Sequence, residues 1–289
     1  MHVVASRDEQ AHEVHGLVGG DATGDPHDDE HPPILPRPPR RGARHDAGAP
    51  VCTVIVRVPA HTDEPVRMLA VRDEDPRRAW DPLGPWWPDS HPGVVGVRDA
   101  RAGGAWLAAD PSRSRVSVIL NRHEVEGATG SRGAVVLDAV VGRAPVAAPP
   151  THGFNLVDID ASGARVTSWD GDAVRSVRLE PGVHMIAHDE VDDAATPRIA
   201  AWLTAFDAAP SDAADGPWYA EWLAVLERSA SLPPTDDRAI VRDNRPHGIP
   251  TLSLLMCAAS IDASGVDIVY GELDAPGAWN RPALHHVSD

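Results

Sequence analysis

A short apolar run, "CTVIVRV" over residues 52–58, is the first stretch of this chain with the pattern of a folded protein. It is rich in β-branched residues, which favour a buried strand. Residues 1–50 have almost no apolar periodicity and many Pro, Gly and Asp. Such a segment cannot bury enough surface to offset the loss of chain entropy. We therefore predict a disordered or mis-annotated N-terminal extension over 1–50 and a single domain over 51–289.

The residue before the cysteine suggests where translation begins. Val51 precedes Cys52, and GTG, a valine codon, often serves as a start codon in GC-rich bacteria. All 26 basic residues are arginine and none is lysine, which indicates a GC-rich coding sequence. We expect translation to start at position 51, and removal of the initiating Met would leave Cys52 with a free α-amine.

The net charge of −17 argues against nucleic acid or an anionic membrane surface as partner. No stretch approaches the roughly 20 apolar residues of a membrane span, and no signal peptide is recognisable at the N-terminus. We expect a cytoplasmic protein whose cysteines, Cys52 and Cys257, stay reduced. No metal or other cofactor is expected, since the "DPHDDEH" segment at 25–31 reads better as a solvated acidic run than as a preorganised metal site.

The order of predicted elements indicates the fold class. Strands are expected first, two amphipathic helices follow at 196–209 and 216–230, and a final hairpin turns around Asp262–Gly265. A further helix is expected within 131–142, with Ser131 as N-cap and Gly142 just past its end. The proline- and tryptophan-rich segment 77–93 is predicted to be a loop. This order is typical of an α+β fold with antiparallel sheets.

Cys52 is the candidate nucleophile. In a terminal cysteine the thiol attacks and its own α-amine is the base. The reference pKa values of these groups, about 8.5 and about 7.7–8.0, both lie near neutrality. An arginine nearby would favour the thiolate. The alternative is that Cys52 is a small buried hydrophobe at the start of a strand.

Six motifs occur in an order and spacing that resemble the NRDE family, which is also described as transport and Golgi organisation 2-like. The resemblance covers roughly residues 51–275, and its motifs are "VCTVIVRV", "LAVRDEDPRRAW", "GVRDARAGGAWLA", "LNR", "SRG" and "HGFNLVDID". The resemblance implies a fold like the N-terminal-nucleophile hydrolases, a four-layer αββα sandwich of two antiparallel sheets. It also implies a cysteine amidohydrolase that cleaves a small-molecule amide through a thioester acyl-enzyme.

The same resemblance implies roles for individual residues. Arg72 and Asp73 follow Cys52 by 20 and 21 positions, where related acylases carry an Arg and an Asp. Arg72 would lower the thiol pKa and Asp73 would orient the terminal amine. Asn155 matches the position of an oxyanion or amine partner. Three further residues are candidates for substrate binding, namely Asn121, Arg122 and Trp106.

The chain also departs from the family pattern. Val71 stands where the family name has Asn, Ala187–His188 replaces a later Ser-Asn pair, and Pro250 lies close to an expected arginine. These departures leave open a drifted member of the family whose fold persists without turnover. The resemblance also leaves open a non-catalytic protein that binds or traffics a small molecule such as haem or a lipid, as its animal relatives imply. His184 and His188 are weaker candidates for a metal or haem ligand.

Overall fold

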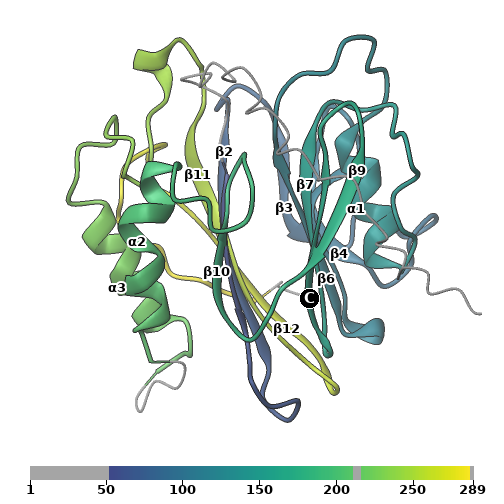
Figure 1. Ribbon diagram of the computed structural model, residues 1–289, viewed down its shortest axis with the longest axis horizontal. Coiled ribbons are helices and arrows are strands. Elements are labelled where there is room, and N and C mark those ends of the chain that lie inside the picture. The colour runs from purple at the N-terminus through teal and green to yellow at the C-terminus, as the bar shows by residue number, and fades with distance from the viewer. Residues whose placement is uncertain (1–51, 211–215, 287–289) are drawn as a thin grey trace, which may run out of the picture. The chain divides into compact units, whose positions relative to one another are not determined.

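In the computed structural model of the chain, residues 52–210 and 216–286 are described, and the predicted extension over 1–50 lies outside them. The described residues form two antiparallel sheets (Figure 1). The five-stranded sheet has the order β10-β1-β2-β11-β12. Its strands are β1 (Thr53–Val58), β2 (Val66–Glu74), β10 (Gly182–Ile186), β11 (Leu252–Asp262) and β12 (Gly265–Glu272).

The second sheet is a meander whose seven strands follow the order of the chain, β3 to β9. Short turns make this possible. At the β7–β8 turn, for example, the Asp160 carboxylate accepts a hydrogen bond from the Ser162 amide, and Gly163 has a φ of 136°. The strands are β3 (Trp80–Gly84), β4 (Val95–Asp99), β5 (Ala105–Asp110), β6 (Arg115–Asn121), β7 (Phe154–Asp160), β8 (Gly163–Trp169) and β9 (Val174–Arg178).

Three α-helices and two short 3-10 helices complete the described part. Ser131 caps α1, as predicted, because its hydroxyl accepts a hydrogen bond from the Gly133 amide. The helix α1 packs on β5 and β6, while α2 and α3 cover the five-stranded sheet (Figure 1). The helices are α1 (Arg132–Val140), α2 (Pro197–Asp207), α3 (Ala220–Ser229), η1 (Pro111–Arg113) and η2 (Arg245–His247).

The hydrophobic residues form two cores, one between the sheets and one between the five-stranded sheet and α2 with α3. Strand β1 contributes to both, since Val54 and Val56 face the other sheet and Ile55 faces the helices. This explains why the run at 52–58 is apolar without alternation. The predicted α+β class with two antiparallel sheets is confirmed, and the layers run helix, sheet, sheet, helix.

The loop predicted over 77–93 is partly wrong. Residues 80–84 form β3, which pairs with β4 at the edge of the seven-stranded sheet. Proline lacks an N–H, but an edge strand needs partners on one side only and therefore tolerates Pro82. The register between β3 and β4 shifts between Asp81 and Gly84, which accommodates that proline.

A pair of glycines joins α1 to the second sheet. A Cβ on Gly104 would lie 2.6 Å from the carbonyl carbon of Gly133. The N-terminus of α1 therefore rests directly on the backbone at the start of β5.

We expect Gly104→Ala to lower the free energy of unfolding by about 1–3 kcal/mol, because two backbone segments must separate to admit the methyl group. Urea unfolding followed by circular dichroism measures this. Ala102→Ser, on the exposed turn two residues earlier, is the control and should change stability by less than about 0.5 kcal/mol. Equal stability of the Gly104→Ala and wild-type proteins would contradict the close contact.

Among the described residues, no helix combines the length and apolar character needed to cross a membrane.

Candidate functional site

Cys52, Arg72 and Asp73 lie together at the ends of two neighbouring strands. Thr53 pairs with Val71 in the antiparallel β1–β2 ladder, so the residue before Thr53 comes beside Arg72. The Cys52 thiol lies 3.8 Å from the carbonyl oxygen of Asp73, to which it donates. Burial and the nearby Asp73 carboxylate raise the pKa of this thiol to about 12, although Arg72 opposes them. The thiol is therefore protonated at neutral pH.

Asp73 points to the opposite face of β2 from Arg72, because successive strand residues alternate. Its Oδ1 accepts a 2.5 Å hydrogen bond from the Ser253 hydroxyl on β11. No described residue donates to its Oδ2, which is buried. Burial raises the pKa of Asp73 to about 6, against the opposing effects of Arg198, the Ser253 hydrogen bond and Arg242. Asp73 is thus a buried carboxyl group with one free acceptor oxygen.

Replacing Asp73 with Asn should remove one pH dependence of stability. The folded protein holds the Asp73 proton up to a pKa of about 6, above its ordinary value of 3.8. The stabilisation from this proton is complete below the unfolded pKa and is lost as pH rises through the folded pKa. From about pH 4.5 to about pH 7.5, the unfolding free energy of the wild type should fall by about 2 kcal/mol relative to Asp73→Asn. Urea unfolding of both proteins at both pH values measures this change. If the difference in unfolding free energy between the wild type and Asp73→Asn is the same at both pH values, the raised pKa is refuted.

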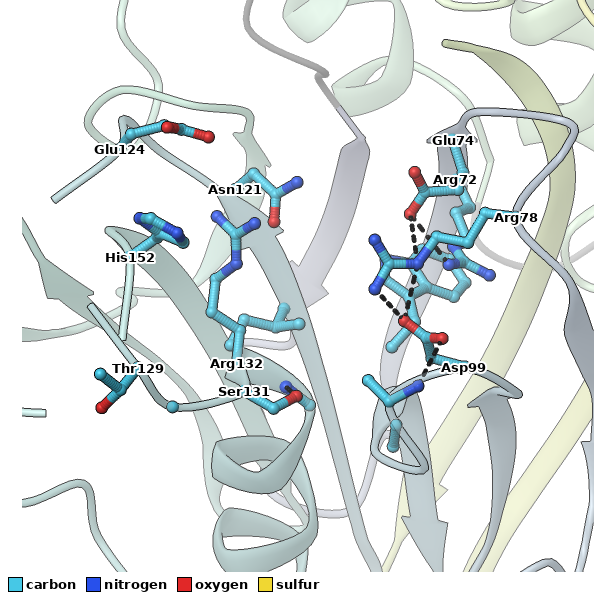
Figure 2. A pocket seen from close by; sticks show the side chains of 16 residues that line it. Arg72, Glu74, Arg78, Asp99, Asn121, Glu124, Thr129, Ser131, Arg132 and His152 are labelled. Carbon is cyan, nitrogen blue, oxygen red and sulfur yellow. Dashed lines mark hydrogen bonds and ion pairs between the residues drawn. The ribbon is translucent and has the colours of Figure 1, made fainter. Parts of the chain in front are cut away.

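Arg72 faces a cavity of about 550 Å³ (Figure 2). Figure 2 shows two walls, one carrying Arg132, Asn121 and His152 and the other Arg72, Arg78 and Asp99. Of the residues proposed from the sequence, Arg72, Trp106 and Asn121 line this cavity. The full lining is Arg72, Glu74, Arg78, Asp99, Ala102, Ala105, Trp106, Ile119, Asn121, Glu124, Thr129, Gly130, Ser131, Arg132, Gly133 and His152.

Most charges in the cavity are paired along one wall. Arg72 Nη2 donates to Glu74 Oε2 over 3.1 Å, and Arg78 pairs with Asp99. The Arg72 guanidinium also lies over the Trp106 ring, 5.8 Å from its centre. Cys52 belongs to this neighbourhood electrostatically, since Arg72 and Glu74 both influence its pKa.

Sequence reasoning missed Arg132, which begins α1 on the other wall of the cavity. The motif "SRG" was interpreted as the start of a helix and as a family motif, with no role given to its arginine. The sequence does contain a glycine in each of the two segments, Gly104 before β5 and Gly133 in α1. These glycines pack together in the structure and so place Arg132 near Trp106.

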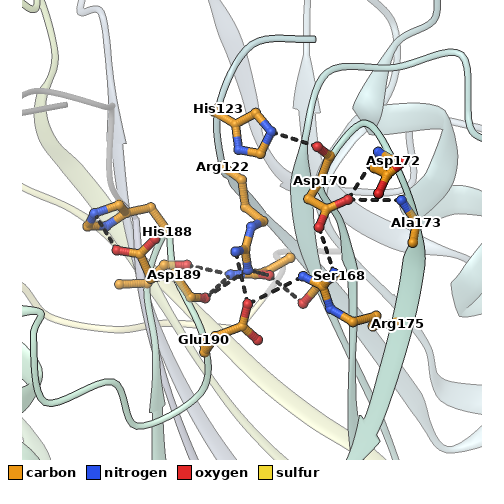
Figure 3. Close-up of polar contacts among 12 residues, drawn as sticks. Arg122, His123, Ser168, Asp170, Asp172, Ala173, Arg175, His188, Asp189 and Glu190 are labelled. Atoms are coloured by element: carbon orange, nitrogen blue, oxygen red, sulfur yellow. Dashed lines mark hydrogen bonds and ion pairs between the residues drawn. The ribbon is translucent and has the colours of Figure 1, made fainter. Parts of the chain in front are cut away.

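Arg122 and Asn155 lie outside this cavity lining. Arg122 belongs to a separate polar cluster (Figure 3), and Asn155 is hydrogen-bonded to it. The Asn155 amide donates to the carbonyl oxygens of Ala187 and Asp189, over 2.9 and 2.8 Å. Its Oδ1 accepts from Arg122 Nη1 and from Ser168 Oγ, over 3.0 and 2.7 Å. Both amide hydrogens are thus engaged, and an oxyanion would have to displace one carbonyl.

This cluster joins the two sheets. Arg122 follows β6 and Asn155 lies on β7, whereas their carbonyl partners belong to the segment after β10. Arg122 Nη2 also pairs with Glu190, 3.0 Å away. The contacts therefore hold the end of β10, which is the neighbour of β1, against the second sheet.

The remaining candidate ligands are dispersed. His184 and His188 each pair with an aspartate, Asp192 and Asp189, at 2.7 and 3.0 Å. In the described part of the chain, no three His, Cys, Asp or Glu side chains gather as a metal site would require. Cys257 is unpaired and fully buried in the core between the sheets.

Comparison with known protein families shows a match over most of the domain. A family model described as Transport and Golgi organisation 2 matches residues 51–245, and no curated protein matches the chain. The match begins at the same position as the motifs recognised in the sequence and confirms that resemblance. Because it covers more than half of the 289 residues, the chain belongs to the Transport and Golgi organisation 2 family.

Proposed function

We propose that this protein is a cysteine amidohydrolase that acts on a small-molecule amide, with Cys52 as nucleophile once its α-amine is free. The observation that carries the proposal is that Cys52 lies beside Asp73 and its neighbour Arg72, and that Arg72 lines a cavity of about 550 Å³. That size suits a small-molecule substrate. The domain that does this chemistry would run over 51–289, without the preceding 1–50.

In the proposed reaction the Cys52 sulfur attacks the carbonyl carbon of the amide. The thiol proton passes to the α-amine and then to the leaving nitrogen as the C–N bond breaks, which leaves a thioester. Water next attacks the thioester carbon and the C–S bond breaks. The carboxylic acid is released and the Cys52 thiol is regenerated. No oxidant or reductant is required.

The neighbouring groups support these roles. Arg72 lowers the pKa of the thiol and so opposes the effect of burial. The free Oδ2 of Asp73 is an acceptor suited to an α-ammonium group on Cys52. In a chain that continues before Cys52, the amide nitrogen cannot act as base, and the thiol stays protonated. Activity is therefore expected only in a protein that begins at Cys52.

The test is to express the gene in its native host and determine the intact mass of the purified protein. A mass corresponding to a chain that starts at Cys52, together with a thioester adduct after brief exposure to a reactive amide or ester, supports the proposal. A mature protein that retains residues ahead of Cys52 and forms no adduct would overturn it.

A second function is favoured by the protonation state of Cys52. A buried thiol with a pKa of about 12 is unreactive, and the cavity lined by Arg72 remains available for a ligand. The protein would then bind or traffic a small molecule, such as haem or a lipid, in the cytoplasm. Titration with haemin distinguishes the two, since a shifted Soret band that depends on Cys52 or a histidine supports binding, and an unshifted band argues against haem.

A further inference from the structure

The cavity that Arg72 lines contains several arginines and few carboxylates that are free to accept from a ligand. Its acidic side chains along one wall are already engaged. Both oxygens of Glu74 accept hydrogen bonds, from the Asp75 amide and from Arg72. Both oxygens of Asp99 also accept, from two backbone amides of the following turn and from Arg78. These carboxylates therefore have little capacity left for a ligand's donors.

Two buried donors on the same cavity have no acceptor. Arg72 Nη1 and Trp106 Nε1 are both inaccessible to solvent, and no described residue accepts a hydrogen bond from either. The two residues are only 3% and 6% exposed and both line the cavity. An unsatisfied buried N–H is costly, so donors of this kind indicate a ligand that brings acceptor oxygens.

The opposite wall adds a cation without a partner carboxylate. Arg132 Nη1 donates to the Gly153 carbonyl over 3.2 Å, and no ion pair joins Arg132 to a carboxylate of the described residues. Glu124, which lines the same cavity, forms no such pair either. Burial lowers the pKa of Arg132, since desolvation of its charge is not fully compensated. Arg132 also lies in the first turn of α1, where the helix dipole favours an anion.

His152 supplies another donor on this wall. Its Nδ1 accepts a hydrogen bond from the Val125 backbone amide over 3.1 Å. The ring proton of the neutral imidazole is therefore on Nε2, which can only donate. Figure 2 shows His152 beside Arg132, across the cavity from Arg72.

We infer that the substrate is an amide that also carries a carboxylate, as an N-acyl amino acid does. The carboxylate binds Arg132, and the amide carbonyl oxygen accepts from Arg72 Nη1 and Trp106 Nε1. Arg72 is also the arginine whose charge acts on the Cys52 thiol. A guanidinium matches a carboxylate with two parallel hydrogen bonds, which explains why an arginine lies at this position. The inference rests on the proposed amidohydrolase function and names its substrate class.

The test uses the full chain with Cys52→Ala, so that binding is measured without turnover. The probes are N-phenylacetylglycine and its neutral counterpart N-phenylacetylglycinamide. The readout is the indole N–H signal of Trp106 in ¹H–¹⁵N spectra, assigned with Trp106→Phe. We expect a saturable shift of this signal by the acid, and a dissociation constant at least about tenfold lower for the acid than for the amide.

Variants of Arg132 decide the anchor. Arg132→Gln should raise the dissociation constant of the acid at least about tenfold. Arg132→Lys, which keeps the charge, should retain part of the affinity. Retained binding in this variant would show that the loss in Arg132→Gln does not come from misfolding. The matched control is Arg228→Gln, which removes one exposed arginine from α3 on the other sheet and should leave binding unchanged.

Equal affinity for the acid and the amide, an absent shift, or wild-type affinity in Arg132→Gln would overturn the inference. Failure of the proposed catalysis is distinguishable. If the acid binds through Arg132 but wild-type protein never forms a thioester, the carboxylate site stands and the amidohydrolase function fails. If a thioester forms equally fast from amides with and without a carboxylate, the function stands and the site fails.

Discussion

Cys52→Ala should lower the rate of acyl-enzyme formation by about a thousandfold or more, because the acyl group has no other nucleophile to receive it. The measurement is intact mass after reaction of protein that starts at residue 52 with p-nitrophenyl phenylacetate. The wild type should gain one phenylacetyl group and the variant none. The variant should keep the wild-type fold, since alanine removes only a sulfur atom from the core between the sheets.

Cys257→Ala is the matched control for this experiment. It removes the other thiol, which is also buried and lies on β11, in the same sheet as β1. Burial raises the pKa of both thiols and neither lines the cavity, but Cys257 lies inside β11 and so can never carry a free α-amine. We expect normal acylation in this variant. Equal acylation of the Cys52→Ala protein and the wild type would exclude Cys52 as the nucleophile.

Trp222→Ala should lower the free energy of unfolding by about 3–5 kcal/mol, the usual cost of removing a large buried aromatic ring. Trp222 is only 2% exposed and packs between α3 and the five-stranded sheet. It makes edge-to-face contacts with Phe206 of α2 and with Trp218, with ring centres 5.9 and 5.7 Å apart. The Arg57 guanidinium of β1 also lies 5.8 Å from its ring centre.

Urea unfolding at neutral pH measures this loss. Glu221→Gln, at an exposed position one residue earlier, is the control and should change stability by less than about 0.5 kcal/mol. Because Trp222 links both helices to β1, its loss should also reduce the protection of α2 and α3 amides from hydrogen exchange. A loss below about 1 kcal/mol would mean that the helical layer contributes little to the stability of the sheet.

Local patterns account for the parts of the fold that were predicted. Ser131 caps a helix because its hydroxyl reaches an amide two residues away, and the Asp262–Gly265 turn forms from its own residues. The segment at 80–84 could not be predicted as a strand, because Pro82 and the prolines that follow the segment argue against one. Only the position of β3 at a sheet edge, with β4 beside it, makes that strand possible.

Some contacts of the candidate site could also be predicted from local patterns, and others could not. The neighbourhood of Cys52, Arg72 and Asp73 could be anticipated, because a hairpin brings its two strand ends together. Asn155 and Arg122, which the resemblance proposed as site residues, instead bond to each other and to the segment after β10. Whether an amide points to a cavity or to a carbonyl depends on a segment more than thirty residues away, and no local pattern records that choice.

The sequence by itself determined the class of fold, the family and the pairing of the first two strands, since these follow from alternation, turns and ordered motifs. Only the tertiary structure decided that Arg132 would face Arg72 and Trp106 across a cavity. That arrangement depends on the backbone contact between Gly104 and Gly133, which brings a helix N-terminus onto the start of a strand. These two glycines produce no periodic pattern in the sequence. Their contact forms only when α1 is packed against the start of β5.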